Sequence, residues 1–600
     1  MKVVTVHGFC KCGVMDFSNK KTMFPWLAFG LCVIFYAALV AIGFDDIEED
    51  AFIYFRFAEN IANGYGYVFN VGGERIEACS GLIWLGLITL LTFLPLHIVL
   101  ATKLLCFVFG VLCIHKVFVL SQRFIPDRFL ALLPAFFMAA SIPFYVWSVR
   151  GLETAFYWFV ALWLLDWATN PDRVRWWWLP AIVLINARPE GVFMLAAVVP
   201  YLFFCQRKTS QFWLGVVWIA LSFLAVTAWR FWYFHDLVPH PFYFKVNPNH
   251  LQSFRNLLTY GWYSGWWLLL LIALPGVVRR WQQQDVALAG FLVLSLLWTV
   301  FVFEDKAFNR HTGIVLPFIY MFTLMLLARW WQPAGWWLRG ASQALLVVLL
   351  AYTLVYAQTV QFENSRRGPF LANFLHALSN NKDYWGKVGR LIKNPDSFQE
   401  KLDKVGVFNI RYNLIASVGD FVHLNYRDDA VVVYDQIGQA PWYAGEKTQF
   451  IDNLGLGYRA IGLSRFHQAA EQSWLYHSYE KVMEFLVGYW WPEEKRVQTN
   501  QEIIEGILSR KPDVIIARKK YIVKERNNLL TDMLRDPAIL AQYQARYLLN
   551  NREIIFERLS PEPSYHKLPA GRFSVPTGAK VQEITAFNWC DNSPCLTLKQ

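Results

Sequence analysis

The feature that most constrains this chain is a series of apolar segments, each long enough to cross a lipid bilayer. The hydrocarbon core of a bilayer is about 30 Å thick, so a helix needs roughly 20 mostly apolar residues to span it. Such segments occur at residues 24–44, 102–120, 129–147, 152–168, 212–234, 261–278, 286–303, 313–329 and 340–359. Two shorter segments, 176–187 and 191–205, are joined by Arg188-Pro189-Glu190 and predict a helical hairpin. The pattern therefore predicts a polytopic α-helical membrane protein with about eleven transmembrane helices.

Composition agrees with a membrane protein. Hydrophobic residues make up 56% of the sequence, above the share that is usual in soluble domains. Tryptophan pairs such as Trp330-Trp331 and Trp336-Trp337 stand at the ends of apolar segments, as in the aromatic belts of bilayer proteins. The net charge of +11 does not indicate a nucleic-acid partner, because the basic residues are scattered in short loops. The first apolar segment is longer than a signal-peptide core and is expected to be a retained anchor.

The basic residues also predict the topology. With a cytoplasmic N-terminus, one face collects Lys20, Lys21, Arg123, Arg128, Arg173, Arg175, Arg207, Lys208, Arg279, Arg280, Arg329 and Arg339. This distribution satisfies the positive-inside rule. It holds only if residues 82–96 form an interfacial helix and not a span. The opposite, extracytoplasmic face then receives a first outer loop at 45–101 and the whole chain after residue 360.

The sequence changes character near residue 360, which divides it into a transmembrane bundle (1–359) and a predicted extracytoplasmic domain (360–600). Short apolar runs, AVVVYD at 430–435 and DVIIAR at 513–518, alternate with charged stretches such as 522–549 that are interpreted as helical. This alternation predicts an α/β or α+β domain, preceded by a helical connector over 360–400.

The cysteines give one specific expectation. Cys590 and Cys595 could close a short disulfide loop if the end of the chain is extracytoplasmic. No histidines stand at zinc-ligand spacing beside them, so no metal site is predicted. No cofactor is required by the sequence, and a divalent metal is left open.

Ionisable residues gather on the predicted outer face. Asp45, Asp46, Glu48, Glu49 and Asp50 follow the first span at once. Crowding of carboxylates at a low-dielectric boundary raises some of their pKa values and suits one of them to act as a base. The alternative is a solvated acidic collar at a helix end.

Cations and further acids recur on the same face. Arg188 and Glu190 form the tip of the short hairpin, where ionisable groups at membrane depth are functional candidates; an internal salt bridge is compatible with that role. Arg230, His240 and Lys245 belong to another outer loop, and Asp305, Arg310 and His311 to a later one. Guanidinium and ammonium groups beside a bilayer are suited to binding a lipid phosphate.

Several of these residues belong to motifs that occur in a fixed order. EDAFIYFRFAENIANGYGYVFN, which contains Arg56, is followed by GERIEACSG with Glu77, then by SVRGLET, ARPEG, R-x-x-Y-F-x-x-x-x-P-x-P-F-Y-F-K and D-x-x-x-x-R. In this order the motifs resemble the GT-C superfamily of polyprenyl-phosphate-sugar glycosyltransferases, and most of all the branch with the mycobacterial terminal arabinofuranosyltransferase. A later segment, YDQIGQAPWYAGEKTQFIDNLGLGYRAIG, is similar to a recurrent segment of the same proteins.

The resemblance implies roles for particular residues. Asp50 matches the second acid of a paired-acid signature and is implied to be the catalytic base. Glu49 stands where relatives commonly have aspartate, so Asp45 and Asp46 remain alternatives. The resemblance implies that Lys245 and Arg310, with Arg188, bind the donor phosphate. Glu153 matches the SVRGLET motif, whereas His240 replaces the usual asparagine.

The implied reaction is an inverting transfer of a sugar, arabinofuranose or another pentose, from polyprenyl phosphate to a cell-envelope glycan, lipid or protein. It would take place at the periplasmic side of a bacterial inner membrane. A transporter or lipid flippase is the main alternative, although it would need polar residues near the middle of the bilayer and paired broken helices. A non-catalytic membrane scaffold is the second, although it gives no reason for acids and cations to converge on one face.

Overall fold

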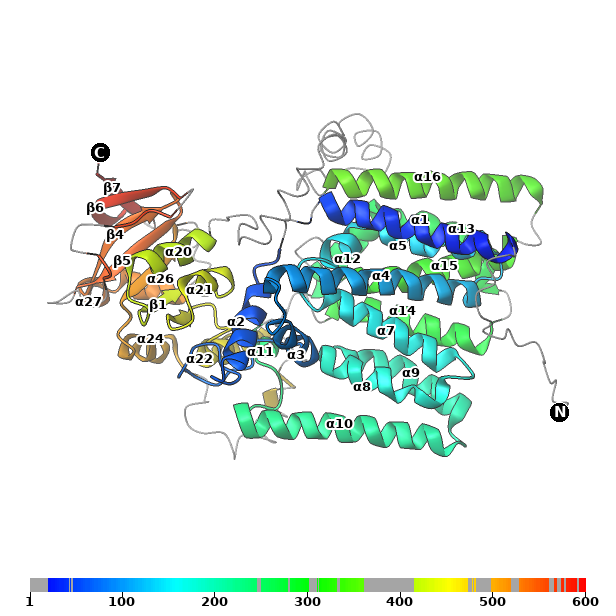
Figure 1. Cartoon of the computed structure of the whole chain (residues 1–600), viewed down its shortest axis with the longest axis horizontal. Helices are drawn as coiled ribbons and strands as arrows, with labels where there is room; N and C mark the ends of the chain where they lie inside the picture. Colours follow the sequence, from blue (N-terminus) through cyan, green and yellow to red (C-terminus); the bar gives the residue numbers. More distant parts are fainter. Residues whose placement is uncertain are drawn as a thin grey trace.

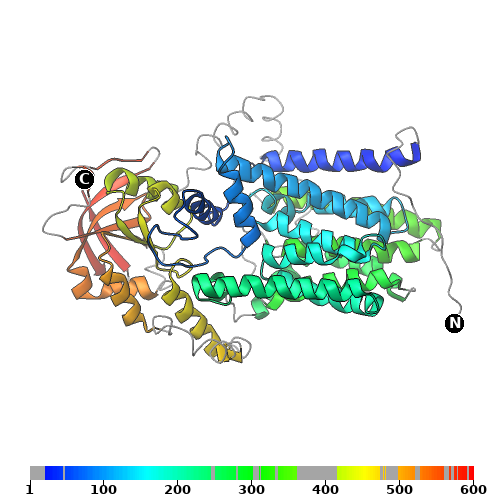
Figure 2. The same ribbon diagram turned by 60° about the horizontal axis from the view of Figure 1, so that its bottom comes forward.

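The fold was analysed in a computed structural model. The structure describes residues 20–42, 44, 47–244, 250–278, 281–301, 310, 312–331, 335–360, 415–472, 477–478, 480–481, 498–519, 528–559, 566–568, 573–576, 579–590 and 593–599. The molecule is elongated, with a helical bundle along most of its length and a sheet-containing domain at one end (Figure 1). The N-terminal end of α1 lies far from the sheet-containing domain, and α1 runs toward that domain (Figures 1 and 2).

The apolar segments form the bundle, because only a helix satisfies its own backbone hydrogen bonds within lipid. Its helices are α1 (Lys20–Ile42), α4 (Ile98–Phe124), α5 (Leu133–Ala140), α6 (Ile142–Trp147), α7 (Thr154–Thr169), α8 (Trp178–Ala187), α9 (Gly191–Gln206), α10 (Ser210–Phe234), α12 (His250–Tyr263), α13 (Trp266–Ala273), α14 (Gln283–Phe301), α15 (Val315–Trp331) and α16 (Trp336–Val360). Short 3-10 turns lie at η1 (Leu130–Leu132), η2 (Val174–Trp176), η3 (Leu274–Val278) and η4 (Thr312–Ile314).

The surface of the bundle is apolar, which indicates that it faces lipid. Within the described residues, five helices are long and apolar enough to cross a membrane, and several shorter helices are also apolar. Along α10, large side chains such as Trp213, Leu221 and Trp232 are exposed. A water-soluble domain rarely exposes so long an apolar face. The prediction of a polytopic helical membrane protein is confirmed, whereas the number of spans and their orientation stay predictions.

Two helices of the bundle differ in their bounds from the predicted apolar segments. The segment predicted as one span over 129–147 is divided at Ser141, which has extended backbone angles between α5 and α6. Pro143 follows at the start of α6 and has no N–H to continue the helical hydrogen bonds. Helix α12 begins at His250, before the apolar segment predicted at 261–278. The segment 82–96 contains α3 (Leu82–Leu91), which at 1.5 Å per residue is too short to cross the bilayer core.

Between the bundle and the sheet domain lie two elements of the first outer loop, α2 (Ala51–Ala62) and α3, together with the short helix α11 (Pro241–Phe244). Figures 1 and 2 show α2 beside α21 of the sheet domain, and the two helices are in contact. The first outer loop is therefore enclosed between the membrane helices and the chain that follows them.

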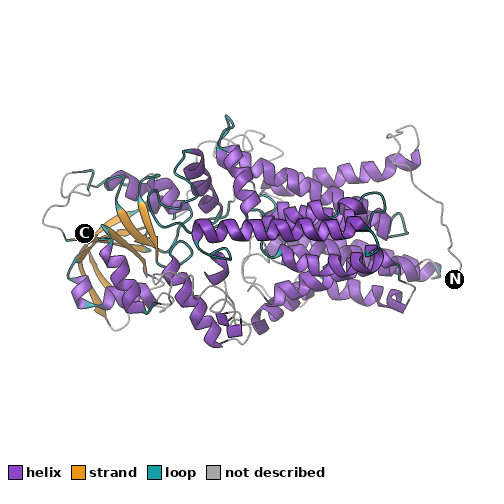
Figure 3. Cartoon of the chain, turned by 90° about the horizontal axis from the view of Figure 1, so that it is seen from below, coloured by secondary structure: helices purple, strands orange, loops and turns teal. Residues whose placement is uncertain are grey.

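The C-terminal domain has a mixed sheet of seven strands in the order β2-β1-β3-β5-β4-β6-β7. The strands are β1 (Val431–Tyr434), β2 (Gln449–Asp452), β3 (Val514–Arg518), β4 (Tyr543–Leu549), β5 (Glu553–Arg558), β6 (Val581–Cys590) and β7 (Ser593–Leu598). Strands β1, β2 and β3 pair in parallel, and β3, β5, β4, β6 and β7 pair antiparallel. The helices are α20 (Ala416–Asn425), α21 (Gln439–Ala444), α22 (Arg459–Gln472), α24 (Asn500–Ser509), α26 (Asn528–Arg535) and α27 (Pro537–Leu540). Figure 3 shows the sheet covered by helices.

The predicted α/β or α+β class is confirmed, including strands at 430–435 and 513–518. The helical interpretation of 522–549 is wrong for β4, which has an irregular register between Ala545 and Tyr547 and so lacks a regular alternation in sequence. The predicted connector at 360–400 lies outside the described residues. Cys595 is disulfide-bonded, and the side chain of Cys590 is not described, so their pairing stays a prediction.

Candidate active site

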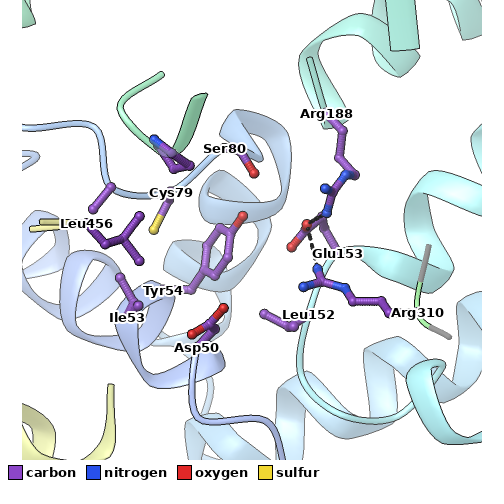
Figure 4. A pocket seen from close by; sticks show the side chains of 12 residues that line it. Asp50, Ile53, Tyr54, Cys79, Ser80, Leu152, Glu153, Arg188, Arg310 and Leu456 are labelled. Atoms are coloured by element: carbon purple, nitrogen blue, oxygen red, sulfur yellow. Dashed lines mark hydrogen bonds and ion pairs between the residues drawn. The ribbon is translucent and has the colours of Figure 1, made fainter. Parts of the chain in front are cut away.

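A pocket lies where the first outer loop, the ends of the bundle helices and the C-terminal domain meet (Figure 4). About 340 Å³ of space, including open solvent at its mouth, is not filled by protein atoms there. Its lining residues are Asp50, Ile53, Tyr54, Ala78, Cys79, Ser80, Leu152, Glu153, Arg188, Pro241, Arg310 and Leu456. Residues from seven separate parts of the sequence therefore form one site.

Asp50 enters the pocket from the N-terminus of α2. It occupies the N-cap position, and its carbonyl accepts a hydrogen bond from Ile53 N at 3.2 Å. Glu48, two residues before Asp50, connects this turn to the SVRGLET loop. Glu48 N donates to Arg150 O at 3.1 Å, and Arg150 Nη1 lies 3.2 Å from Glu48 Oε2. Asp50 therefore stands at a fixed distance from the neighbouring loop, which contributes Leu152 and Glu153 to the same pocket.

The acids and cations of the short motifs form a buried ion network on one side of the pocket. Arg188 pairs with both Glu153 and Glu190, and Arg310 Nη2 donates to Glu153 Oε1 at 3.1 Å. Arg310 Nε also donates to Thr154 Oγ1 at 3.3 Å. Glu153 is only 1% exposed, so two guanidinium groups share one buried carboxylate. The Arg188–Glu190 pair is the internal salt bridge considered from the sequence, whereas the sharing of Glu153 by Arg188 and Arg310 was not expected.

Arg188 and Arg310 differ in how many of their guanidinium N–H groups are paired with protein acceptors. Arg188 is held between two carboxylates and forms part of the wall. Among the described residues, Arg310 Nη1 has no hydrogen-bond partner, while the guanidinium group lies 5.3 Å from the centre of the Trp147 ring. Arg310 is therefore the cation best placed to bind an anionic group in the pocket.

A second ion pair supports the pocket from outside. Arg230 donates from Nε and Nη2 to the two carboxylate oxygens of Glu77, at 2.8 and 3.1 Å. Burial raises the pKa of Glu77, and the charge of Arg230 opposes that shift. His240 N donates to the carbonyl of Glu77 at 3.1 Å. These three residues do not line the pocket. They hold the segment that ends at Glu77, and residues 78–80, which follow it, line the pocket.

Glu49 and Arg56 face the C-terminal domain and not the pocket. Glu49 Oε1 accepts from the backbone N–H groups of Gly438 at 2.6 Å and Gln439 at 3.2 Å. Burial, reinforced by the charge of Asp50, raises the pKa of Glu49. A Cβ at Gly438 would lie 2.1 Å from Glu49 O, so only glycine permits this approach. Of the paired acids, Asp50 alone reaches the pocket, and Glu49 ties it to the domain behind.

Arg56 makes the other major contact with that domain. Its guanidinium group donates to Phe69 O at 2.8 Å, Pro441 O at 2.7 Å and Thr448 O at 2.7 Å. Burial lowers the pKa of Arg56 to about 10, so the group remains charged at neutral pH. The segment after β1, which the sequence comparison singled out, is thus the surface that holds the first outer loop.

Some expected residues cannot be placed, and some functional residues were not expected. Asp45, Asp46, Lys245, Asp305 and His311 lie outside the described residues. In the part of the chain that the structure does describe, no three His, Cys, Asp or Glu side chains come together as a metal site. Sequence reasoning assigned no role to Tyr54, Cys79 or Leu456. All three lie within the quoted segments, but an uncharged lining residue leaves no signal that separates it from a core residue.

The bundle, the enclosed outer loop and the sheet-containing domain at one end together form a GT-C-like fold. The solved structure of ArnT from Cupriavidus metallidurans in the apo state matches with a TM-score of 0.50 and 11% sequence identity, over 91% of this chain and 100% of that chain. The same protein bound to undecaprenyl phosphate matches with a TM-score of 0.48 and 12% identity, over 90% and 99% of the two chains.

An oligosaccharyltransferase from Archaeoglobus fulgidus in the apo form matches with a TM-score of 0.45 and 10% identity, over 95% of this chain and 77% of that chain. No protein-family model and no curated protein sequence matches the chain. At such low identities the likeness concerns the fold alone. The predicted GT-C fold is confirmed, whereas the arabinofuranosyltransferase branch stays a prediction.

Proposed function

We propose that this protein is a glycosyltransferase that moves a sugar from a polyprenyl-phosphate donor to a hydroxyl-bearing acceptor. The observation that carries the proposal is the position of Asp50, which lines a pocket opposite the Arg188–Glu153–Arg310 network at the end of a membrane bundle. A carboxylate facing fixed cations is the combination that transfer from a phosphate ester requires: a base for the nucleophile and positive charge for the leaving group.

In the proposed reaction the acceptor hydroxyl gives its proton to the carboxylate of Asp50. Its oxygen attacks the anomeric carbon of the donor sugar as the bond from that carbon to the phosphate oxygen breaks. Polyprenyl phosphate leaves with the bonding electrons, and the sugar is transferred with inversion. Arg310 stabilises the developing phosphate charge, helped by Arg188 and by Lys245, whose contribution is inferred from its motif alone.

The membrane explains the choice of donor. A polyprenyl chain can lie against the apolar bundle while its phosphate reaches the arginines at the end of the helices. Residues 1–359 are proposed to bind this donor, and residues 360–600 to close the site from the other side. By the positive-inside argument, the pocket faces the periplasm of a bacterial inner membrane. Arabinofuranose or another pentose is the proposed sugar, and a cell-envelope glycan, lipid or protein is the proposed acceptor.

The test is Asp50→Asn in the purified full-length protein, assayed with synthetic polyprenyl-phosphate sugars. Loss of a general base is expected to lower kcat by roughly 10²- to 10⁴-fold, while thermal unfolding stays within a degree or two of wild type. Glu49→Gln is the matched variant: it is expected to weaken docking of the C-terminal domain and to lower Tm. Asp429→Asn, at an exposed site, controls for the handling of the protein.

Two results would count against the proposal. Asp50→Asn could retain near-normal transfer while Glu49→Gln loses transfer at an unchanged Tm. That result would show that Asp50 is not the base. Solute uptake by wild-type proteoliposomes, without transfer from any polyprenyl-phosphate sugar, would favour a transporter.

A further inference from the structure

The two sides of the pocket differ in chemistry. Figure 4 shows Arg188, Glu153 and Arg310 on one side, Leu456, Ile53 and Cys79 on the other, and Asp50 between them. Apart from Asp50, none of the residues that line the second side carries a charge. The cationic side belongs to the bundle helices, whereas Leu456 comes from the C-terminal domain.

Leu456 lies on a turn whose conformation is fixed by hydrogen bonds to Asp452. Asp452, at the end of β2, accepts hydrogen bonds from Leu454 N at Oδ1 and from Gly457 N at Oδ2, both at 2.8 Å. Gly455 has a φ of +98°, and a Cβ there would lie 2.6 Å from the Ile461 side chain. A short polar side chain that caps two N–H groups fixes a turn in one conformation. The direction of Leu456 is thus determined before any substrate binds.

The same turn is anchored to the outer loops on either side of Leu456. The carbonyl of Gly455 lies 2.8 Å from His240 Nε2. Arg459, which follows the turn, donates from Nε to Glu74 at 2.8 Å, from Nη2 to Arg75 O at 2.8 Å, and forms an ion pair with Asp236. Leu456 itself is 7% exposed. These anchors hold Leu456 in place, and together with Ile53 and Cys79 of the first outer loop it forms the uncharged wall of the pocket.

We infer that this wall is the acceptor subsite and that Leu456 determines acceptor specificity. The inference rests on the proposed function: a lipid-linked donor must enter from the bundle, so its phosphate meets the arginines and the acceptor comes from the opposite side. There the acceptor presents a hydroxyl to Asp50 and an apolar face to Leu456. Among the described residues that line this side, none is a cation, so a phosphate or carboxylate on the accepting unit would be unbalanced and is disfavoured. The acceptor class is therefore a neutral sugar or alcohol.

The test uses full-length protein in nanodiscs, a polyprenyl-phosphate sugar as donor, and two acceptor series: neutral octyl glycosides, and the same glycosides with a phosphate monoester on the accepting sugar. Wild type is expected to prefer the neutral series. Leu456→Ala is expected to raise the KM for the neutral acceptor about 10-fold or more, with the donor KM and kcat within about 3-fold. Leu454→Ala, two residues away on the same turn and outside the pocket lining, is the matched control and leaves both KM values unchanged.

A charge substitution sharpens the test. Leu456→Lys adds a cation to the acceptor side and is expected to shift the preference toward the phosphorylated series. A wild-type preference for phosphorylated acceptors would overturn the inference. So would a Leu456→Ala variant that matches Leu454→Ala, or one that changes the donor KM alone. Wild-type protein that transfers sugar neither to these acceptors nor to water refutes the proposed function itself, which is a different result.

Discussion

Replacing Arg56 by methionine is the perturbation that most directly tests how the C-terminal domain is attached to the catalytic loop. Arg56 is 3% exposed, and methionine retains much of its apolar length while removing its charge and its donors. The substitution removes the arginine donor from the carbonyls of Phe69, Pro441 and Thr448, of which Phe69 O keeps a second donor, Asn60 Nδ2 at 3.2 Å. Two of these three acceptors belong to the C-terminal domain, so the loss should fall on the docking of that domain.

The magnitude follows from the two hydrogen bonds to the C-terminal domain, because Phe69 O keeps its bond from Asn60. A buried acceptor that loses its partner costs about 1 to 3 kcal/mol, so two of them sum to roughly 2 to 6 kcal/mol. Part of this is recovered because a charge no longer has to be buried. We therefore expect Arg56→Met to lower the free energy of unfolding by about 3 to 5 kcal/mol, which is large against the 5 to 15 kcal/mol typical of a folded domain.

The assay combines thermal unfolding in detergent with hydrogen exchange over residues 439–452. The expected result is a lower Tm and faster exchange in that segment. Arg427→Met is the matched control, because Arg427 forms an exposed ion pair with Asp429 in the same domain and such pairs contribute less than about 1 kcal/mol. If the two variants lose equal stability, or if exchange over 439–452 stays at the wild-type rate, Arg56 does not hold the domain in place.

Three further predictions concern the same region. Gly438→Ala puts a Cβ 2.1 Å from a backbone oxygen of the outer loop and should lower the free energy of unfolding by about 2 to 3 kcal/mol. The control is Gly86→Ala, whose Cβ meets nothing within 4 Å and should not lower Tm. Equal Tm values for the two variants would contradict the contact at Gly438. Burial, reinforced by a nearby carboxylate, raises the pKa of Glu59 to about 7, so the folded protein binds more protons than the unfolded chain between its ordinary value and pH 7. Stability should therefore fall as the pH rises through that window, and Glu59→Gln should flatten the Tm profile from pH 5 to 8; an unchanged slope would refute this assignment. Arg188→Met leaves its buried carboxylate partners short of a cation and should cost about 3 to 5 kcal/mol, of which Glu153→Gln in the same chain should restore part; strict additivity in this double-mutant cycle would show that the two residues are not coupled.

Most of the charged residues of the site could be predicted from local sequence features. Asp50 follows a transmembrane segment, and Glu153, Arg188 and Arg310 each stand in a polar motif that interrupts an apolar one. A charged residue beside a bilayer is conspicuous in sequence because burying it there is costly. Those residues were therefore found as candidates, and the structure brings them to one pocket. The role of Glu49 was less accessible, because its partners are backbone groups of a helix far along the chain.

What the sequence by itself determined is the helical bundle, the change to an α/β domain and the acids and cations at the helix ends. These features depend on hydropathy, periodicity and charge, which act over neighbouring residues. Only the tertiary structure decided that Leu456 would complete the pocket, that Arg56 would bind backbone carbonyls of the C-terminal domain, and that β4 would be a strand. Each of these depends on which distant surface is buried against the residue, and burial is a property of the packed molecule that no local pattern encodes.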